Sequence, residues 1–224
     1  MTSKNVRNGI MEKAVEVKNL VKIYKNDVKV LDNVSYEFGC GKFYAIMGRS
    51  GAGKSTLLNI IGTIDNATSG EVYIQGREVT SLSEKEKAGL RAKSLGFVFQ
   101  GFYLNPYLSA LENVIVPMRI NPDIPAKERK SRALALLEDF GVKEQADSLP
   151  SQMSGGEQQR VCIARALANS PEIVLADEPT GNLDEANEKI VFSYLKQLAE
   201  QGHTVIAVSH NEAVKEYADE IIMM

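Results

Sequence analysis

The chain has 224 residues, enough for one substantial hydrophobic core and too few for two ordinary independent domains. Its formal net charge is −3 with lysine and arginine scattered along it, which argues against a nucleic-acid partner. Cys40 and Cys162 have neither metal-ligand nor disulfide-framework spacing, as expected in a reducing compartment. No apolar run reaches the roughly 20 residues of a membrane-spanning helix, so we expect a cytoplasmic chain.

The first part of the chain is predicted to be a tail followed by strands. Residues 1–12 are expected to form a flexible tail and residues 13–224 a single domain. Apolar and polar residues alternate over Val15–Tyr24, which predicts a half-buried strand, and a second strand is expected near Val28–Val34. Phe43–Met47 is an apolar run followed by glycine, which is typical of a strand covered on both faces.

The middle of the chain is predicted to be mainly helical. Ser83 and Ser109 are each followed three residues later by glutamate, the spacing of a capping box that starts a helix. We therefore expect a helical subdomain over about residues 101–152. The predicted elements in this part are a helix over Thr56–Ile61, a small antiparallel layer with Gly70–Ile74 and Val79, a helix from Ser83 to near Lys93, a buried strand over Leu95–Phe99, and helices over Asn113–Ile120 and Lys127–Phe140.

The last part of the chain alternates helices with buried strands. The predicted elements are a helix over Ser154–Asn169, a strand over Ile173–Ala176, a helix over Glu185–Gln201, a strand over Val205–Val208, a helix over Asn211–Ala218 and a strand over Glu220–Ile222. This order predicts an α/β fold with a mostly parallel core sheet and helices on both of its faces.

A glycine-rich segment between a predicted strand and a predicted helix matches the pattern G-x-x-x-x-G-K-[ST] of a phosphate-binding loop. It reads Gly48-Arg49-Ser50-Gly51-Ala52-Gly53-Lys54-Ser55, with Thr56 next to it. Glycine allows the backbone N–H groups of such a loop to point at phosphates, and the helix dipole adds to the attraction. We expect Lys54 to reach the β- and γ-phosphates of ATP and the Ser55 hydroxyl to bind Mg²⁺. The alternative is a glycine-rich turn without a ligand.

Polar residues also follow three other predicted strands, at the sheet edge where open α/β folds bind ligands. Asp177 is expected to meet Mg²⁺, and Glu178 to orient or deprotonate the attacking water. Gln100 is expected to contact Mg²⁺ and the water, and His210 the γ-phosphate. Each residue alone has the alternative of an ordinary polar group at a strand end. His203 begins its strand and is assigned no role.

A second set of backbone N–H donors is predicted where Ser154, Gly155 and Gly156 open a helix. One nucleotide does not easily need both this set and the phosphate loop from the same chain. We therefore expect two chains to hold ATP between them.

Together with the Asn182-Leu183-Asp184 turn, these motifs resemble the ATP-binding subunit of an ABC transporter in order and spacing, from about Val15 to Ile222. The chain is similar to the P-loop ATPases of the lipoprotein-release and macrolide-export type, which have antimicrobial-peptide exporters and the cell-division ATPase as relatives. The resemblance implies that Tyr24 stacks on adenine and that Ser154, Gly155 and Gly156 bind the γ-phosphate held by a second subunit. Asp184 would lie near that phosphate across the interface, and residues 100–111 would face a transmembrane permease subunit.

Four features depart from the usual family pattern. Met153 replaces a frequent leucine, and Glu157 stands where many members have glutamine. Residues 62–67 lack the proline that is usual after the first helix. Relatives commonly continue through another strand after the position of Met224, so either the last strand is less well anchored or the C-terminus is shortened here.

The resemblance implies an ATPase that works as a homodimer with a transmembrane permease at the inner face of the cell membrane. The main hypothesis is that closure of the dimer on ATP powers export, or extraction of a substrate from the membrane. The alternative is a signalling or scaffold module of the cell-division type that switches a membrane partner without transport. A soluble ABC ATPase acting on DNA or ribosomes would need a second cassette, a coiled coil or basic arms, and the sequence has none of these.

Overall fold

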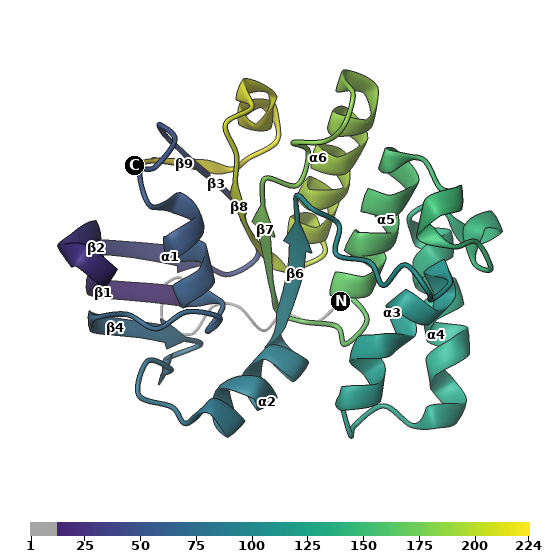
Figure 1. The fold of residues 1–224 in the computed structure, drawn as a ribbon, viewed down its shortest axis with the longest axis horizontal. Coiled ribbons are helices and arrows are strands. Elements are labelled where there is room, and N and C mark those ends of the chain that lie inside the picture. Colours follow the sequence, from purple (N-terminus) through teal and green to yellow (C-terminus); the bar gives the residue numbers. More distant parts are fainter. Residues whose placement is uncertain (1–12) are drawn as a thin grey trace.

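The computed structural model describes residues 13–224, so the tail predicted for residues 1–12 lies outside the described residues. Two sheets lie side by side, with helices between and around them (Figure 1). The strands are β1 (Lys13–Tyr24), β2 (Val28–Gly39), β3 (Phe43–Met47), β4 (Ser69–Ile74), β5 (Arg77–Glu78), β6 (Leu95–Phe99), β7 (Ile173–Asp177), β8 (Thr204–Val208) and β9 (Glu220–Met223). The α-helices are α1 (Lys54–Ile61), α2 (Glu84–Ser94), α3 (Ala110–Ile120), α4 (Ala126–Asp139), α5 (Gly155–Ala166) and α6 (Glu185–Glu200).

The central sheet has five parallel strands in the order β6-β7-β8-β3-β9. Every residue of β3 and β8 is buried, which explains why these strands are apolar throughout except for Thr204. The carboxyl ends of parallel strands meet at one edge, so the segments after β3, β6, β7 and β8 are brought together there. The predicted parallel α/β fold is confirmed.

The predicted antiparallel layer is also confirmed, and two strands that the sequence assigned to no sheet belong to it. It contains four strands in the order β2-β1-β4-β5, and its two longest members are the strands expected near residues 15–24 and 28–34. Val79 follows β5 and donates its backbone N–H to Val72 at 2.8 Å. Alternating hydrophobicity indicates a strand but not its neighbour, so the sequence left open which sheet these two long strands join.

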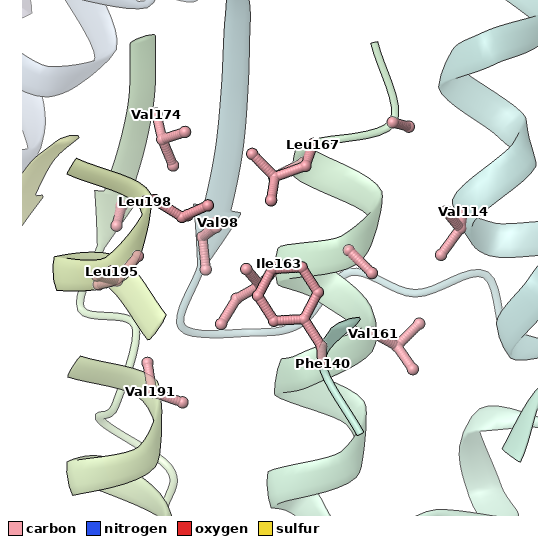
Figure 2. Close-up of a cluster of buried hydrophobic side chains, with 14 of the residues drawn as sticks. Val98, Val114, Phe140, Val161, Ile163, Leu167, Val174, Val191, Leu195 and Leu198 are labelled. Atoms are coloured by element: carbon pink, nitrogen blue, oxygen red, sulfur yellow. The ribbon is translucent and has the colours of Figure 1, made fainter. Parts of the chain in front are cut away.

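Two hydrophobic clusters cover the faces of the parallel sheet. On one face α1 packs between the two sheets and buries Leu57 and Ile61 against both. On the other face α5 and α6 pack against the sheet. Figure 2 shows Ile163 of α5 and Leu198 of α6 gathered near Val98 of β6. This packing fixes the first turns of α1, α5 and α6.

The helical region contains α3 and α4, which pack against α5 (Figure 1, right). Ser83 and Ser109 form the predicted capping boxes at the start of α2 and α3, and Ser154 forms a third one at the start of α5, where the sequence predicted only a helix start. None of the helices over residues 13–224 has the length and apolar character needed to cross a bilayer.

The predicted final helix is wrong. The structure has a short 3₁₀ helix over Glu212–Glu216 instead of an α-helix over Asn211–Ala218. The side chain of Asn211 caps this turn by accepting a hydrogen bond from the backbone of Ala213 at 2.9 Å. The backbone N–H groups of Val214 and Tyr217 donate to carbonyl oxygens three residues earlier, at 3.2 and 3.1 Å, so the turn is wound more tightly than an α-helix. β9 then pairs with β3 at the sheet edge, and the Met224 N–H donates to Met47 at 2.8 Å. The last strand is thus paired on one side.

Three further 3₁₀ turns cover Lys25–Asp27, Lys143–Gln145 and Pro150–Gln152.

Candidate functional site

The phosphate loop curls around the side chain of its own lysine. Gly48, Gly51 and Gly53 all have positive φ, and a Cβ atom on Gly53 would lie 2.8 Å from the backbone oxygen of Val30. Lys54 opens α1, is buried, and donates from Nζ to the carbonyl oxygens of Gly48 and Arg49, both at 3.0 Å. The Lys54 ammonium group therefore lies inside the loop, at the N-terminus of α1, where helices commonly bind phosphate.

A cleft of about 670 Å³ opens over this loop and joins it to the ends of β7 and β8. It is lined by Val30, Ser50, Gly51, Ala52, Gly53, Lys54, Ser55, Thr56, Glu178 and His210. Three of the four predicted strand ends thus meet around one cleft.

Ser55 and Asp177 form the candidate metal-binding pair. Ser55 Oγ donates to Asp177 Oδ1 at 2.8 Å. Burial raises the pKa of the Asp177 carboxyl, although the bond from Ser55 and the charge of Lys54 oppose the change. The described residues contain no group of three or more histidine, cysteine or acidic side chains that could enclose an ion. One hydroxyl and one carboxylate fit Mg²⁺, which keeps several waters and binds phosphate oxygens beside few protein ligands.

Glu178 and His210 form the second pair in the cleft. Oε2 of Glu178 lies 2.8 Å from Nδ1 of His210 and also accepts the His210 backbone N–H at 3.3 Å. Glu178 has a left-handed backbone with φ of 48°, and its N–H donates to Val208 at 3.0 Å. A glutamate held in an unfavourable backbone conformation beside a cleft is typical of a functional residue.

Gln100 lies apart from the cleft lining. Its side chain packs over Gly181, where an added Cβ would be 2.6 Å from Gln100 Nε2. The backbone carbonyl oxygen of Gln100 accepts a hydrogen bond from Asn182 Nδ2 at 2.8 Å. The structure therefore joins Gln100 to the turn after Glu178, and its predicted contact with Mg²⁺ remains a prediction.

Tyr24 is exposed at the end of β1 and lies beside the cleft. Its hydroxyl donates to Asp65 Oδ2 at 2.7 Å and is 3.5 Å from Thr56 Oγ1. Asp65 was not identified from the sequence, since nothing in its local pattern predicts a contact with a strand 41 residues earlier.

The remaining predicted residues form a separate cluster at the first turns of α5 and α6. Ser154 caps α5, with its Oγ 2.7 Å from Glu157 Oε2. Asp184 caps α6 and accepts from the backbone N–H and the side chain of Asn187, both at 2.9 Å. A Cβ atom on Gly156 would lie 2.1 Å from Asn187 Oδ1.

Asn187 therefore joins the Ser154-Gly155-Gly156 turn to Asp184, and sequence reasoning missed it. Its position three residues after a helix-capping aspartate is the only local signal. Among the described residues, none of this cluster lines the cleft over the phosphate loop. The two groups of residues that the sequence predicts to bind phosphate therefore do not share a cleft in this chain.

An apolar groove of about 580 Å³ lies between α2, β6, α3 and α5. Tyr103, Val116 and Ile120 line it and are exposed to solvent. Arg165 also lines the groove, and its Nη2 donates to the carbonyl oxygen of Phe102 at 2.7 Å. His203 lies just before β8, at the opposite end of this strand from His210, and its Nδ1 is 2.7 Å from the backbone oxygen of Pro171.

Known proteins resemble the chain over nearly its whole length. The family described as ABC transporter matches residues 31–181. The uncharacterized ABC transporter ATP-binding protein MJ1508 of Methanocaldococcus jannaschii is 49% identical over 94% of this chain and 95% of its own length. The macrolide export ATP-binding/permease protein MacB of Pasteurella multocida is 45% identical, over 94% of this chain but only 33% of that longer protein.

Solved structures agree with this relationship. The dimeric structure of the ABC transporter cassette MJ0796 has a TM-score of 0.87 and 43% identity, and covers 94% of both chains. A second dimeric structure of that cassette, in a post-hydrolysis state with ADP and Pi, has a TM-score of 0.86. The fold, the phosphate loop and these similarities together show that the chain belongs to the ABC transporter family, as an ATP-binding domain.

Proposed function

We propose that this chain hydrolyses ATP in a pair of identical subunits and drives a transmembrane permease from the inner face of the cell membrane. One observation carries the proposal. The phosphate loop faces one cleft, while Asn187 joins Gly156, two residues after Ser154, to Asp184 elsewhere. Two copies related by a two-fold axis would bring the second arrangement of each onto the nucleotide of the other. The related cassette MJ0796 is dimeric.

Within one subunit, different residues in and beside the cleft bind the phosphates, orient the water, hold Mg²⁺ and contact the adenine. Lys54 and the loop N–H groups bind the phosphates and stabilise charge on the transferred group. Glu178, held by His210, orients the water for attack in line with the leaving oxygen. Ser55 and Asp177 would hold Mg²⁺, which when bound neutralises charge on the β- and γ-phosphates. Tyr24 stacks on the adenine.

Within the pair, ATP binding is coupled to closure. Ser154 at the start of α5 donates to the γ-phosphate bound by the other subunit, and Asp184 lies beside it. ATP favours the closed pair only because it makes more contacts there than in the open pair. Residues 101–152 act as a helical subdomain that carries this movement to the permease.

The apolar groove is the docking surface for that permease. Exposed Tyr103, Val116 and Ile120 suit an amphipathic segment of the partner, and Arg165 ties the groove wall to α5. Relatives named as macrolide and pyoverdine exporters favour export over import. The alternative is an ATP-driven switch that acts on a membrane partner without transport, as in the cell-division relative.

The test is ATP hydrolysis by the purified chain, alone and reconstituted with its membrane partner in vesicles. Hydrolysis that increases steeply with protein concentration supports the paired site, because a single chain has only half of it. Movement of a substrate across the vesicle membrane supports export. Hydrolysis coupled to a partner that moves nothing supports the switch. A monomeric form with full activity would contradict the proposal.

A further inference from the structure

A lysine, a tyrosine and an aspartate form one bonded cluster beside the phosphate loop. Lys22 and Tyr24 lie two residues apart on β1, and Asp65 lies in the turn after α1. Asp65 Oδ1 accepts from Lys22 Nζ and from the Asn66 backbone N–H, both at 2.7 Å. Asp65 Oδ2 accepts from the Tyr24 hydroxyl, also at 2.7 Å. Three donors therefore hold this carboxylate in one orientation.

The same contacts fix the plane of the Tyr24 ring, although this side chain is exposed. Lys22 Nζ lies 4.6 Å from the ring centroid, within the distance of a cation–π contact. The ammonium covers one face of the ring while the hydroxyl is bonded to Asp65. Tyr24 is nevertheless 43% exposed to solvent. A ring that is held this firmly and still exposed is prepared for a flat ligand and does not fill a core.

The cluster is connected to the nucleotide cleft and is itself well supported. Thr56, whose hydroxyl is 3.5 Å from that of Tyr24, lines the cleft over the phosphate loop. Lys22 Nζ donates to the Asn66 carbonyl oxygen and Lys87 Nζ to Asn66 Oδ1, both at 2.6 Å. Both lysines are buried, and buried ammonium groups need such partners. The turn that carries Asp65 is thus fixed from two sides.

We propose that Asp65 is a positioning residue for the purine base of the nucleotide, because it sets with Lys22 the plane of Tyr24 on which the base stacks. The inference rests on the proposed function, since the purine is that of ATP bound in the phosphate loop. The held ring has already lost the rotational freedom that binding would otherwise remove, which corresponds to roughly three- to tenfold in affinity.

The test compares binding of ATP with binding of inorganic tripolyphosphate, which has the phosphate chain without the base. Tyr24→Phe keeps the ring but removes its hydroxyl, and Asp65→Asn keeps the size of the side chain but removes its charge. Each substitution is expected to weaken ATP binding roughly three- to tenfold and to leave tripolyphosphate binding unchanged. The double variant should bind ATP no more weakly than the weaker single variant, because both changes remove one arrangement.

The chain supplies a matched control on the same antiparallel sheet. Lys18 Nζ lies 4.5 Å from the Tyr73 ring centroid, and the Tyr73 hydroxyl donates to Glu71 at 2.8 Å. These three residues have the same kinds of contact as Lys22, Tyr24 and Asp65, a lysine over a tyrosine ring and a tyrosine hydroxyl bonded to a carboxylate. They do not line the cleft over the phosphate loop. Tyr73→Phe and Glu71→Gln should leave both affinities unchanged.

The possible results separate this inference from the proposed function. Unchanged ATP affinity in Asp65→Asn, or equal weakening of ATP and tripolyphosphate, would overturn the positioning role. If Tyr24→Ala weakens ATP binding while Asp65→Asn does not, base stacking stands and the role of Asp65 is lost. A wild-type chain that binds neither ligand would overturn the proposed function itself.

Discussion

Oε2 of Glu178 and Nδ1 of His210 lie 2.8 Å apart at the ends of two neighbouring parallel strands. The backbone N–H of His210 also donates to this oxygen, so the carboxylate is held by two groups of one residue. The side chain of Glu178 is 18% exposed and that of His210 is 68% exposed. Both side chains line the cleft over the phosphate loop, and the histidine is the more exposed member of the pair. This pairing gives two predictions.

The first prediction concerns the charge of Glu178. In Glu178→Gln the amide keeps the shape of the side chain but no longer attracts a proton from water, so turnover should fall by roughly 100-fold or more. ATP binding should persist, and the variant should form a stable ATP-dependent dimer on size-exclusion chromatography. Phosphate release measures turnover. Glu185→Gln is the control, because Glu185 pairs with Lys189 on the exposed face of α6. Hydrolysis at the wild-type rate by Glu178→Gln would show that Glu178 does not orient the attacking water.

The second prediction compares the effects on kcat of replacing each of the two histidines of the chain. His210→Ala removes the partner of Glu178 and should lower kcat roughly 10- to 100-fold with little change in the affinity for ATP. His203→Ala should leave kcat unchanged, since its ring contacts the Pro171 oxygen at the opposite end of β8. Equal effects of the two substitutions on kcat would show that the pairing of His210 with Glu178 has no part in hydrolysis.

Most of the fold could be predicted because its strands and helix starts are encoded locally. Buried parallel strands such as β3 are apolar runs, serine followed three residues later by glutamate marked the starts of α2 and α3, and Ser154 marked the start of α5. The extent of the antiparallel sheet could not be predicted, because it depends on which strands pair. The prediction of a final α-helix was wrong because the backbone bonds of Val214 and Tyr217 span three residues, and residue spacing in so short a segment does not distinguish a 3₁₀ turn from an α-helix.

The candidate site could be predicted where motifs lie at strand ends, since parallel strands bring these ends together. Glu178 and His210 are 32 residues apart and meet for that reason. Residues that support the motifs were missed. Asn187 and Asp65 act through contacts made after folding, and a single polar residue in a helix or turn gives no signal of such contacts.

The third prediction concerns the close approach of α5 and α6. Gly156→Ala would place a methyl group 2.1 Å from Asn187 Oδ1, so Asn187 must move. Asn187 donates to both carboxylate oxygens of Asp184, and moving it would release Asp184 from its present position. We expect ATP-dependent dimerisation to weaken roughly tenfold or more while each chain still binds ATP.

Two measurements check this third prediction. Analytical ultracentrifugation in a Glu178→Gln background reports dimerisation, and fluorescence titration reports ATP binding. Gly89→Ala is the control, since a Cβ atom there would meet nothing within 4 Å. A Gly156→Ala variant that dimerises like its parent would show that the α5–α6 contact is not part of the interface.

The fourth prediction is that Asp177 makes the free protein less stable. Burial raises the pKa of this carboxyl above its ordinary value of 3.8, so the folded chain holds the proton more tightly than the unfolded chain. Stability is therefore lost as pH rises from 3.8 through the folded pKa, and the loss persists at neutral pH. Asp177→Asn removes the ionised group and should raise the melting temperature at pH 7, by roughly 2–4 °C for each kcal/mol recovered.

The same substitution should nearly abolish Mg²⁺-dependent hydrolysis, so that stability and activity change in opposite directions. Melting curves are recorded with a chelator and without nucleotide, at pH 7 and at lower pH, where the gain should shrink as the pH approaches 3.8. Asp32→Asn is the control, because Asp32 is 70% exposed and pairs only with Lys29 among the described ion pairs. A lower melting temperature of Asp177→Asn at pH 7 would mean that the bond from Ser55 outweighs the burial of the charge, and that Asp177 stabilises the fold as well as the site.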